Sequence, residues 1–347
     1  IEGVALTALR VDRMDRAGEL LAELRGRLGE VGEVGYEAQL ALELEELEEV
    51  LNLLRDGRHH EAALCALFWW EHLGDALEEL CELLGGHFEA SEKPLSAALY
   101  SRVEGGRERH EGLFRQLEGE GALERAALDG QALEILDGAL SGSETASALR
   151  YRAIVADARL ENEEAADLAA QAVERDGDDL LARLTLLRIL EENFVAELEA
   201  AEEEGDEAAE VELEPSEALL RCIDAGLDKA PGHPRLLRAL AHYGADAERA
   251  LAATGTLIGY DPRDRDAFEA RARLLRQLGR LDQLAAVVAH LVALGGDDLE
   301  MVARARQALD DEAQSAARGE SSPWLKIVIA VGIAAAIALL IWKSSGN

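Results

Sequence analysis

Hydrophobic residues recur at helical spacing through residues 265–296. A first run of apolar positions stops at Gly279, and a second run stops at Gly295 and Gly296. Residues three or four apart lie on the same face of an α-helix, and glycine often ends a helix. The segment therefore predicts two amphipathic helices that pack as an antiparallel hairpin. Its apolar positions are Phe268, Ala272, Leu275, Leu278, Leu281, Leu284, Val288 and Leu291.

The same pattern occurs in residues 146–177, with matching positions at Leu149, Ala153, Ala156, Ala165, Ala169 and Ala172. One apolar residue near the start of each second helix marks the hairpins along the chain: Ala62, Ala98, Ala132, Ala165, Leu219, Ala250 and Leu284. Successive markers are 36, 34, 33, 54, 31 and 34 residues apart. An acidic insertion accounts for the long step, so the chain predicts a repeat of ~34 residues. A further marker, Ala17, precedes a longer first helix predicted at 36–55.

This organisation resembles the tetratricopeptide repeat (TPR), which has a period of ~34 residues and small residues where its two helices cross. Pro231 and Pro262 stand where that family often ends its second helix. The positions of the family's tryptophan and tyrosine hold Phe268 and Leu275 in the best repeat. Between residues 85 and 130 the match is poor, because the sequence GGRERHEG interrupts the pattern.

The resemblance implies an α-solenoid whose first helices line a concave surface that binds a protein or peptide. In residues 265–296 the polar positions on that surface would be Asp266, Glu269, Arg273, Arg276 and Gln277. We take these five as candidate partner-binding residues. The alternative is that they form an ordinary solvated helix face.

The amino-acid composition agrees with an all-α fold. Alanine, leucine, glutamate and arginine dominate the sequence, and these residues favour helices. Alternating runs of β-branched and aromatic residues, which are typical of strands, are nearly absent, and aromatic residues make up only 4%. The expected fold class is all-α, a TPR-like α-solenoid of antiparallel hairpins with one C-terminal transmembrane helix.

The transmembrane prediction depends on residues 324–342, which contain a single charge, at Lys326. A helix of this length is ~28 Å long, close to the ~30 Å hydrocarbon core of a bilayer. Trp324 and Trp342 stand at the two ends, where tryptophan suits the membrane interfaces, and Lys343 follows. Near one end, Lys326 can extend its ammonium group to the interface. The sequence predicts a single-pass C-terminal anchor; the alternative is a buried core helix.

The charges that flank this anchor do not determine its orientation in the membrane. Lys326 and Lys343 flank the helix symmetrically, so the excess of positive charge that marks the cytoplasmic side does not decide the orientation. With a signal peptide before Ile1 the soluble domain would lie outside, and without one it would lie in the cytoplasm. We expect a cytoplasmic domain.

These patterns divide the sequence into successive parts. They are divergent N-terminal helical repeats (1–130), TPR-like repeats (131–309) with an acidic insertion (197–214), a linker (310–323), the transmembrane helix (324–342) and a short tail (343–347).

The charge of the chain restricts its partners. It carries 70 acidic and 35 basic residues, a net charge of −35, which argues against binding nucleic acid. The insertion, ELEAAEEEGDEAAEVELE, has ten carboxylates and no basic residue, and we expect it to form a solvated loop. Such a loop would attract a basic protein or peptide, so Glu202, Glu203 and Glu204 are further candidate contacts.

No pattern of catalytic, cofactor-binding or metal-ligating residues is complete. His60-Glu61 and His110-Glu111 begin like the zinc motif HExxH, but Leu64 and Phe114 replace its second histidine. His59, His60 and His72 could approach one another on adjacent turns, although histidines on a helix surface are the commoner arrangement. The three cysteines, Cys65, Cys81 and Cys222, include no CxxC pair and are expected to be free thiols. We expect no enzyme activity, cofactor or metal.

Two functions fit these features. The first is a membrane-anchored TPR-like scaffold or adaptor that binds a protein or peptide, of basic character, near a bilayer. The second is an accessory or regulatory subunit of a membrane-embedded machine for secretion or envelope assembly.

Overall fold

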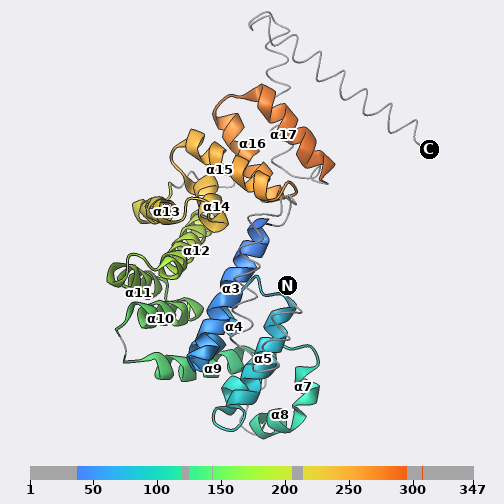
Figure 1. Cartoon of the computed structure of the whole chain (residues 1–347), viewed down its shortest axis with the longest axis vertical. Helices are drawn as coiled ribbons and strands as arrows, with labels where there is room; N and C mark the ends of the chain where they lie inside the picture. Colours follow the sequence, from blue (N-terminus) through green and yellow to red (C-terminus); the bar gives the residue numbers. More distant parts are fainter. Residues whose placement is uncertain (1–36, 119–124, 143, 205–213, 295–306, 308–347) are drawn as a thin grey trace, which may run out of the picture. The chain divides into compact units, whose positions relative to one another are not determined.

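The computed structural model describes residues 37–118, 125–142, 144–204, 214–294 and residue 307 (Figure 1). Every regular element in these ranges is an α-helix, and the helices, α3 to α17, pack in sequential pairs. The expected all-α class is confirmed, and the pairing is consistent with a helical repeat. The chain divides into two compact units, unit 1 up to Pro234 and unit 2 from Arg235 onward.

Unit 1 contains most of the helices. The first seven are α3 (Glu37–Arg55), α4 (His59–Phe68), α5 (Asp75–Phe88), α6 (Lys93–Tyr100), α7 (Gly106–Arg109), α8 (Glu111–Glu118) and α9 (Arg125–Leu140). They are followed by α10 (Ala146–Ala158), α11 (Asn162–Arg175), α12 (Leu180–Glu204) and α13 (Glu217–Lys229). The sequence GGRERHEG forms the short α7 and the turn into α8, which explains why the repeat pattern fails there.

The hairpin predicted at 146–177 is confirmed as α10 and α11. Thr145 caps α10 by accepting a hydrogen bond from the backbone N–H of Ala148. The small residues of both helices are buried against each other, which allows the helix axes to approach closely. In Figure 1, α10 to α13 follow one another along one side of unit 1.

Unit 2 contains α14 (Pro234–Tyr243, whose first residue belongs to unit 1), α15 (Ala247–Tyr260), α16 (Arg265–Gln277) and α17 (Leu281–Ala293). The hairpin predicted at 265–296 is confirmed as α16 and α17. Asp264 caps α16 by accepting from the N–H of Ala267. Gly279 turns the chain with a φ of +66°, a conformation that favours glycine.

The marker residues of the repeat share one environment. All seven have a relative exposure of 0%. Five lie near the start of a helix, namely Ala62, Ala165, Leu219, Ala250 and Leu284, whereas Ala98 and Ala132 lie in the middle or second half of α6 and α9. The hydrophobic spacing in the sequence therefore identified fully buried positions correctly from α4 to α17. The ~34-residue repeat itself stays a prediction with which the helix pairs are consistent.

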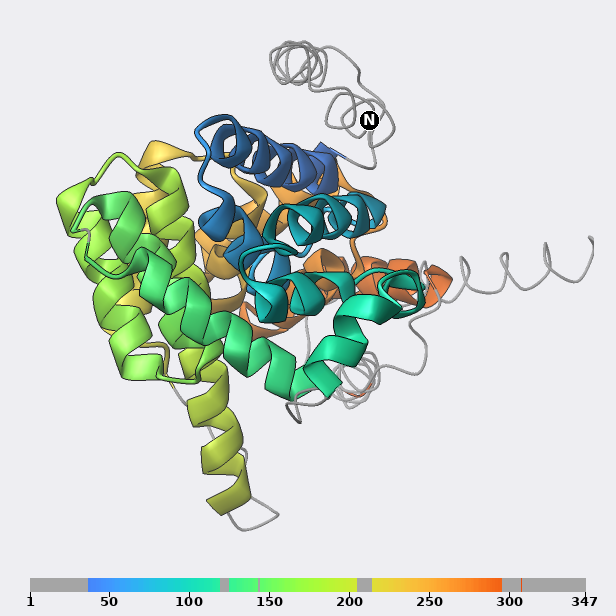
Figure 2. The same cartoon turned by 90° about the horizontal axis from the view of Figure 1, so that it is seen from below.

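The acidic insertion is partly helical. Its first eight residues, 197–204, continue α12 to Glu204 instead of forming the expected loop. Figure 2 shows the C-terminal part of α12 extending past the neighbouring helices. Alanine and glutamate are strong helix formers, which favours this continuation of the helix.

Several expectations lie outside the described residues. They concern the marker Ala17, the linker 310–323 and the predicted transmembrane helix 324–342 with Trp324, Lys326, Trp342 and Lys343. Within the part of the chain that the structure describes, no helix is long and apolar enough to span a bilayer.

Candidate partner-binding face of the first helices

Asp266, Glu269, Arg273, Arg276 and Gln277 lie along one side of α16. All of them are exposed except Glu269, which is half-buried. The opposite side of the helix carries the buried apolar residues of unit 2. We call these five residues the α16 face.

Two of the charged side chains on the α16 face have defined partners. Arg273 donates hydrogen bonds from Nη2 to the carbonyl oxygens of Ala241, at 3.0 Å, and His242, at 3.3 Å. These carbonyls end α14, where a cation complements the helix dipole. Burial lowers the pKa of Arg273, although a guanidinium remains charged at neutral pH. Glu269 pairs with Arg265 at 3.3 Å.

Arg276 differs from Arg273. Among the described residues, its guanidinium makes no hydrogen bond or ion pair, and it lies exposed one turn beyond Arg273. The α16 face therefore has one arginine that is held by backbone carbonyls and one that is free to bind an anionic group.

The matching positions on α10 are covered by another part of the chain. The alignment of the two hairpins places Ser147, Arg150, Ile154 and Asp157 where α16 has Asp266, Glu269, Arg273 and Arg276. Arg150 is only 4% exposed and Ile154 only 1%. The residues that cover them come from α3, α4 and the turn between α4 and α5.

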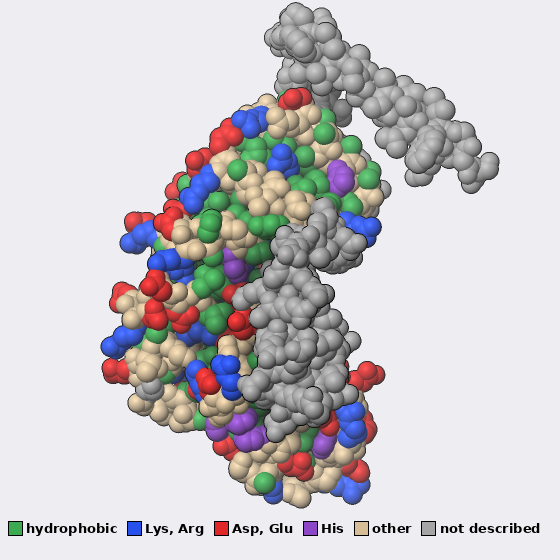
Figure 3. Space-filling model, viewed as in Figure 1, with side chains coloured by type: hydrophobic (Ala, Val, Ile, Leu, Met, Phe, Trp, Pro, Cys, Tyr) green, Lys and Arg blue, Asp and Glu red, His purple; other side chains and the backbone are tan. Residues whose placement is uncertain are grey.

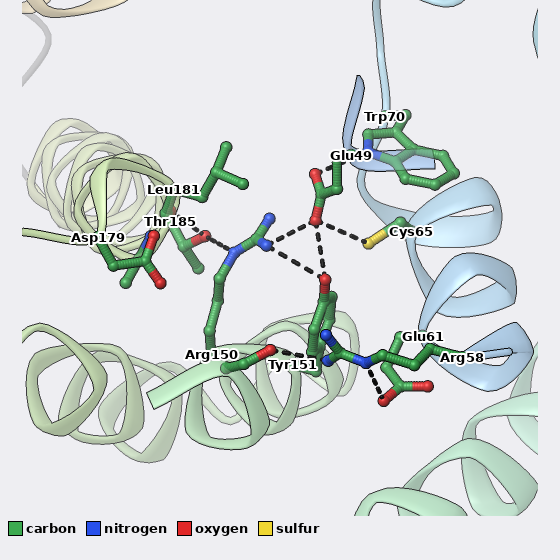
Figure 4. Close-up of polar contacts among 12 residues, drawn as sticks. Glu49, Arg58, Glu61, Cys65, Trp70, Arg150, Tyr151, Asp179, Leu181 and Thr185 are labelled. Carbon is green, nitrogen blue, oxygen red and sulfur yellow. Dashed lines mark hydrogen bonds and ion pairs between the residues drawn. The ribbon is translucent and has the colours of Figure 1, made fainter. Parts of the chain in front are cut away.

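Glu49 of α3 makes the central contact with α10 (Figure 4). Its carboxylate accepts hydrogen bonds from Arg150 Nη1 at 2.6 Å and from Tyr151 Oη at 3.0 Å. Trp70 donates from Nε1 to the second oxygen at 3.1 Å. Arg150 Nε donates to Thr185 Oγ1 of α12 at 2.9 Å. The network joins α3, α10 and α12 through groups that are all buried.

Burial and charge act in opposite directions in this network. Burial by itself would raise the pKa of Glu49, but the charge of Arg150 and hydrogen bonds from Arg150, Trp70 and Tyr151 hold it below its ordinary value. The pKa of Arg150 is raised, because Glu49 outweighs the effect of burial on the guanidinium. Glu49 and Arg150 are therefore a charged, hydrogen-bonded pair at neutral pH.

A second contact covers the start of α10. Arg58, which precedes α4, donates from Nη2 to Ser147 Oγ at 2.7 Å, and Glu61 pairs with Arg58 Nε at 3.0 Å. The guanidinium also lies 5.2 Å from the centre of the Tyr151 ring.

The turn between α4 and α5 covers α12 in a similar way. The buried positions of α12 align Arg188 with Arg273. Arg188 lies 4.1 Å from the centre of the Trp69 ring and donates to the Trp69 carbonyl oxygen at 2.8 Å. It also pairs with Glu71 at 3.1 Å and with Glu192 at 2.7 Å. Trp69 and Glu71, both from this turn, therefore contact Arg188 of α12, the first helix of its pair.

One carboxyl group of the covered region has a strongly shifted pKa. Burial, and then the neighbouring Glu192, raise the pKa of Asp157 to about 7, while Arg188 acts in the opposite direction. Asp157 occupies the position that Arg276 has on α16. The same helix position thus carries a carboxyl group with a raised pKa in unit 1 and an exposed guanidinium in unit 2.

The histidines singled out in the sequence do not come together. His59 stacks on His87 with the ring centres 3.9 Å apart, His60 contacts Glu92 at 3.0 Å, and His72 contacts Glu46 at 2.9 Å. No group of three metal-ligating side chains occurs within the described ranges. This arrangement assigns the histidines to helix packing.

The three cysteines are free and buried. Burial raises the pKa of Cys81 to about 12 and that of Cys222 to about 11, and it raises that of Cys65 well above its ordinary value. A thiol with a raised pKa is a poor nucleophile at neutral pH. Trp70 joins the core at 5% exposure, while Phe68 and Trp69 are half-buried against it.

Sequence reasoning found the α16 face but missed the pairing of Glu49 with Arg150. Glu49 is one of six glutamates in α3, and the local pattern does not distinguish it from the others. A weak signal was present at Arg150, which stands between Leu149 and Tyr151 at a position next to the apolar stripe. The contacts of Glu202, Glu203 and Glu204, at the end of α12, are outside what the structure describes.

No protein-family model matches the sequence, and no curated protein matches it. The classification therefore depends on the described helices, which form an all-α structure of sequential pairs consistent with a helical repeat.

Proposed function

We propose that the chain is a membrane-anchored, TPR-like scaffold that binds a protein or peptide partner near a bilayer. The observation that carries this proposal is the exposed α16 face. Matching positions on α10 and α12 are buried or half-buried under the chain's own α3 and α4–α5 turn. The α16 face has the same place in its hairpin, and within unit 2 its charged groups remain accessible.

A photocrosslinking amino acid placed at Gln277 of the full chain in native membranes tests the partner directly. Gln277 is exposed on the α16 face, and Thr256, exposed on α15, is a matched control position. We expect a specific protein product from position 277 and none from position 256. The same product from both positions, or no product from 277, contradicts the proposal. An integral membrane protein as the product would favour the accessory-subunit function.

The anchor is supported by residues 324–342, whose length and composition suit a bilayer. We expect the full chain to stay with membranes after a salt wash and a chain lacking 324–347 to be released with its helical content intact. Fractionation and circular dichroism measure both properties. Retention of the shortened chain on washed membranes would contradict the anchor. The cytoplasmic placement of units 1 and 2 is part of the proposal and is tested by protease protection of sealed vesicles.

A basic partner would be attracted first by the acidic part of the chain. The charge of −35 and the ten carboxylates of 197–214 favour fast association with a basic segment, and salt would slow it. Once the crosslinked partner is purified, stopped-flow association at low and high salt measures this effect. Deletion of 197–214 should lower the association rate more than it raises the dissociation rate. Association that does not depend on salt would assign these carboxylates to solubility alone.

A further inference from the structure

Unit 2 does not share the acidic character of the chain. Residues 235–294 contain nine arginines and seven carboxylates, a net charge of +2 with neutral histidines, against −35 for the whole chain. Figure 3 shows basic and acidic side chains interspersed over the part of the molecule that holds α15 and α16. A partner of uniform positive charge is therefore attracted to the chain as a whole but gains little at this unit.

The charges of the α16 face are sorted along the helix. Asp266 and Glu269 lie in its first turns, and Arg273 and Arg276 lie in its last turns. Ten residues separate Asp266 from Arg276, which corresponds to ~15 Å along an α-helix. The face presents a negative end and a positive end to whatever binds it.

The positive end is suited to carboxylates. The two carbonyls that end α14 hold Arg273 in place, so less side-chain freedom is lost when it binds a ligand. Arg276 has no partner among the described residues. Guanidinium groups form paired hydrogen bonds with carboxylates, and these bonds are stronger than those between neutral groups.

Unit 1 shows how the chain covers faces of this kind. Glu49 pairs with Arg150 of α10, and Glu71 pairs with Arg188 of α12, the position equivalent to Arg273. In both cases the covering segment brings a carboxylate to an arginine of a first helix. These covered faces also include the apolar residues Ile154 and Leu184, whereas the α16 face has none. The α16 face therefore suits a polar ligand that binds reversibly.

We propose that the α16 face binds a partner segment of mixed charge. Carboxylates of that segment pair with Arg273 and Arg276, and a basic group ~10–15 Å away lies over Asp266 and Glu269. This inference rests on the proposed scaffold function and specifies the partner: its binding segment is neither uniformly basic nor uniformly acidic.

Four fluorescent helical peptides of about 16 residues test this with the full chain in detergent. Two have a glutamate block and a lysine block, in opposite orders; the others carry only glutamate or only lysine on the same alanine-rich background. Fluorescence anisotropy measures their affinities. We expect one order of the mixed peptide to bind about tenfold tighter than either uniform peptide. A uniform peptide that binds as tightly as the mixed peptide overturns the inference.

Charge reversal locates the binding site. Arg276→Glu should weaken the mixed peptide about tenfold, and replacing its glutamate block by lysine should restore binding to this variant. Arg263→Glu is the matched control, because Arg263 is exposed, lies before α16 and changes the net charge equally. Equal losses in the two variants overturn the inference, as does the absence of rescue while thermal unfolding is unchanged.

The crosslinking experiment at Gln277 separates this inference from the proposed function. A crosslinked partner together with no preference for mixed charge overturns the inference and leaves the scaffold function standing. No crosslinked partner at position 277 contradicts both.

Discussion

The first helices of the helix pairs in the two units have equivalent faces that differ in burial. On α10 and α12 the face is buried or half-buried under α3, α4 and the α4–α5 turn, and its arginines pair with carboxylates of those segments. On α16 the equivalent positions are exposed except for the half-buried Glu269, and Arg276 has no partner among the described residues. A pattern of paired helices therefore does not fix which helix faces become part of the core. What else packs against the helix decides this.

The largest expected effect concerns the hairpin core that both units share. Leu284 is 0% exposed at the crossing of α16 and α17. Leu284→Asp places a carboxylate in this apolar site and should lower the free energy of unfolding by about 4 kcal/mol. Urea denaturation followed by circular dichroism measures the change. Gln283→Asp, an exposed neighbour, is the control and should have little effect. Equal midpoints for the two variants would show that position 284 is not a crossing.

The next prediction tests whether the packing of α3 on α10 depends on the buried ion pair between Glu49 and Arg150. Glu49→Ala leaves the Arg150 guanidinium buried without a counter-charge and should cost about 3–5 kcal/mol. The double variant Glu49→Leu, Arg150→Met removes both charges and should recover most of this loss. Urea denaturation of the three proteins decides the point. A single variant as stable as the parent would mean that α3 holds its place by apolar packing alone.

Glu49 also makes the stability of the chain depend on pH. Its folded pKa is depressed, so the stability from this carboxylate is present above the unfolded value and is lost as the pH falls through the folded one. Asp157 behaves in the opposite way. Its pKa is raised from 3.8 to about 7, so the folded state binds the proton more tightly and loses this stability as the pH rises through 7.

A substitution at Asp157 separates its contribution to the pH dependence of stability from that of Glu49. Asp157→Asn keeps a hydrogen-bond donor towards Glu192 and removes the titration. It should flatten the stability profile between about pH 4 and 7 and should stabilise the chain by about 1 kcal/mol at pH 8, a value discounted for partial exposure. Thermal unfolding across this pH range measures it. A profile with an unchanged slope would assign the dependence to other groups.

The smallest effect on stability is expected for the α16 face. Arg276→Ala should change the free energy of unfolding by less than about 0.5 kcal/mol, because the side chain is exposed and makes no contact that folding requires. Arg150→Ala removes a buried arginine from the α10 face, which leaves the Glu49 carboxylate without its counter-charge, and should cost about 3–5 kcal/mol. Similar losses of stability in the two variants would show that the α16 face and the α10 face do not differ in this respect.

The helices and two of their hairpins could be predicted from the sequence alone. Apolar spacing located seven fully buried positions, and the turn at Gly279 separated α16 from α17 as predicted. These features are local, because a helix face and a helix end depend on residues within a few positions of each other. For the same reason the exposed residues of α16 could be chosen from the pattern.

The contact by which α3 covers α10 could not be predicted from the sequence. Arg150 and Glu49 are 101 residues apart, and their contact depends on the path of the chain through α4 to α9. A glutamate in an acidic helix and an arginine beside an apolar stripe look like surface residues in sequence. They become core residues when two helices far apart in the chain meet, because burial then makes each charge depend on the other.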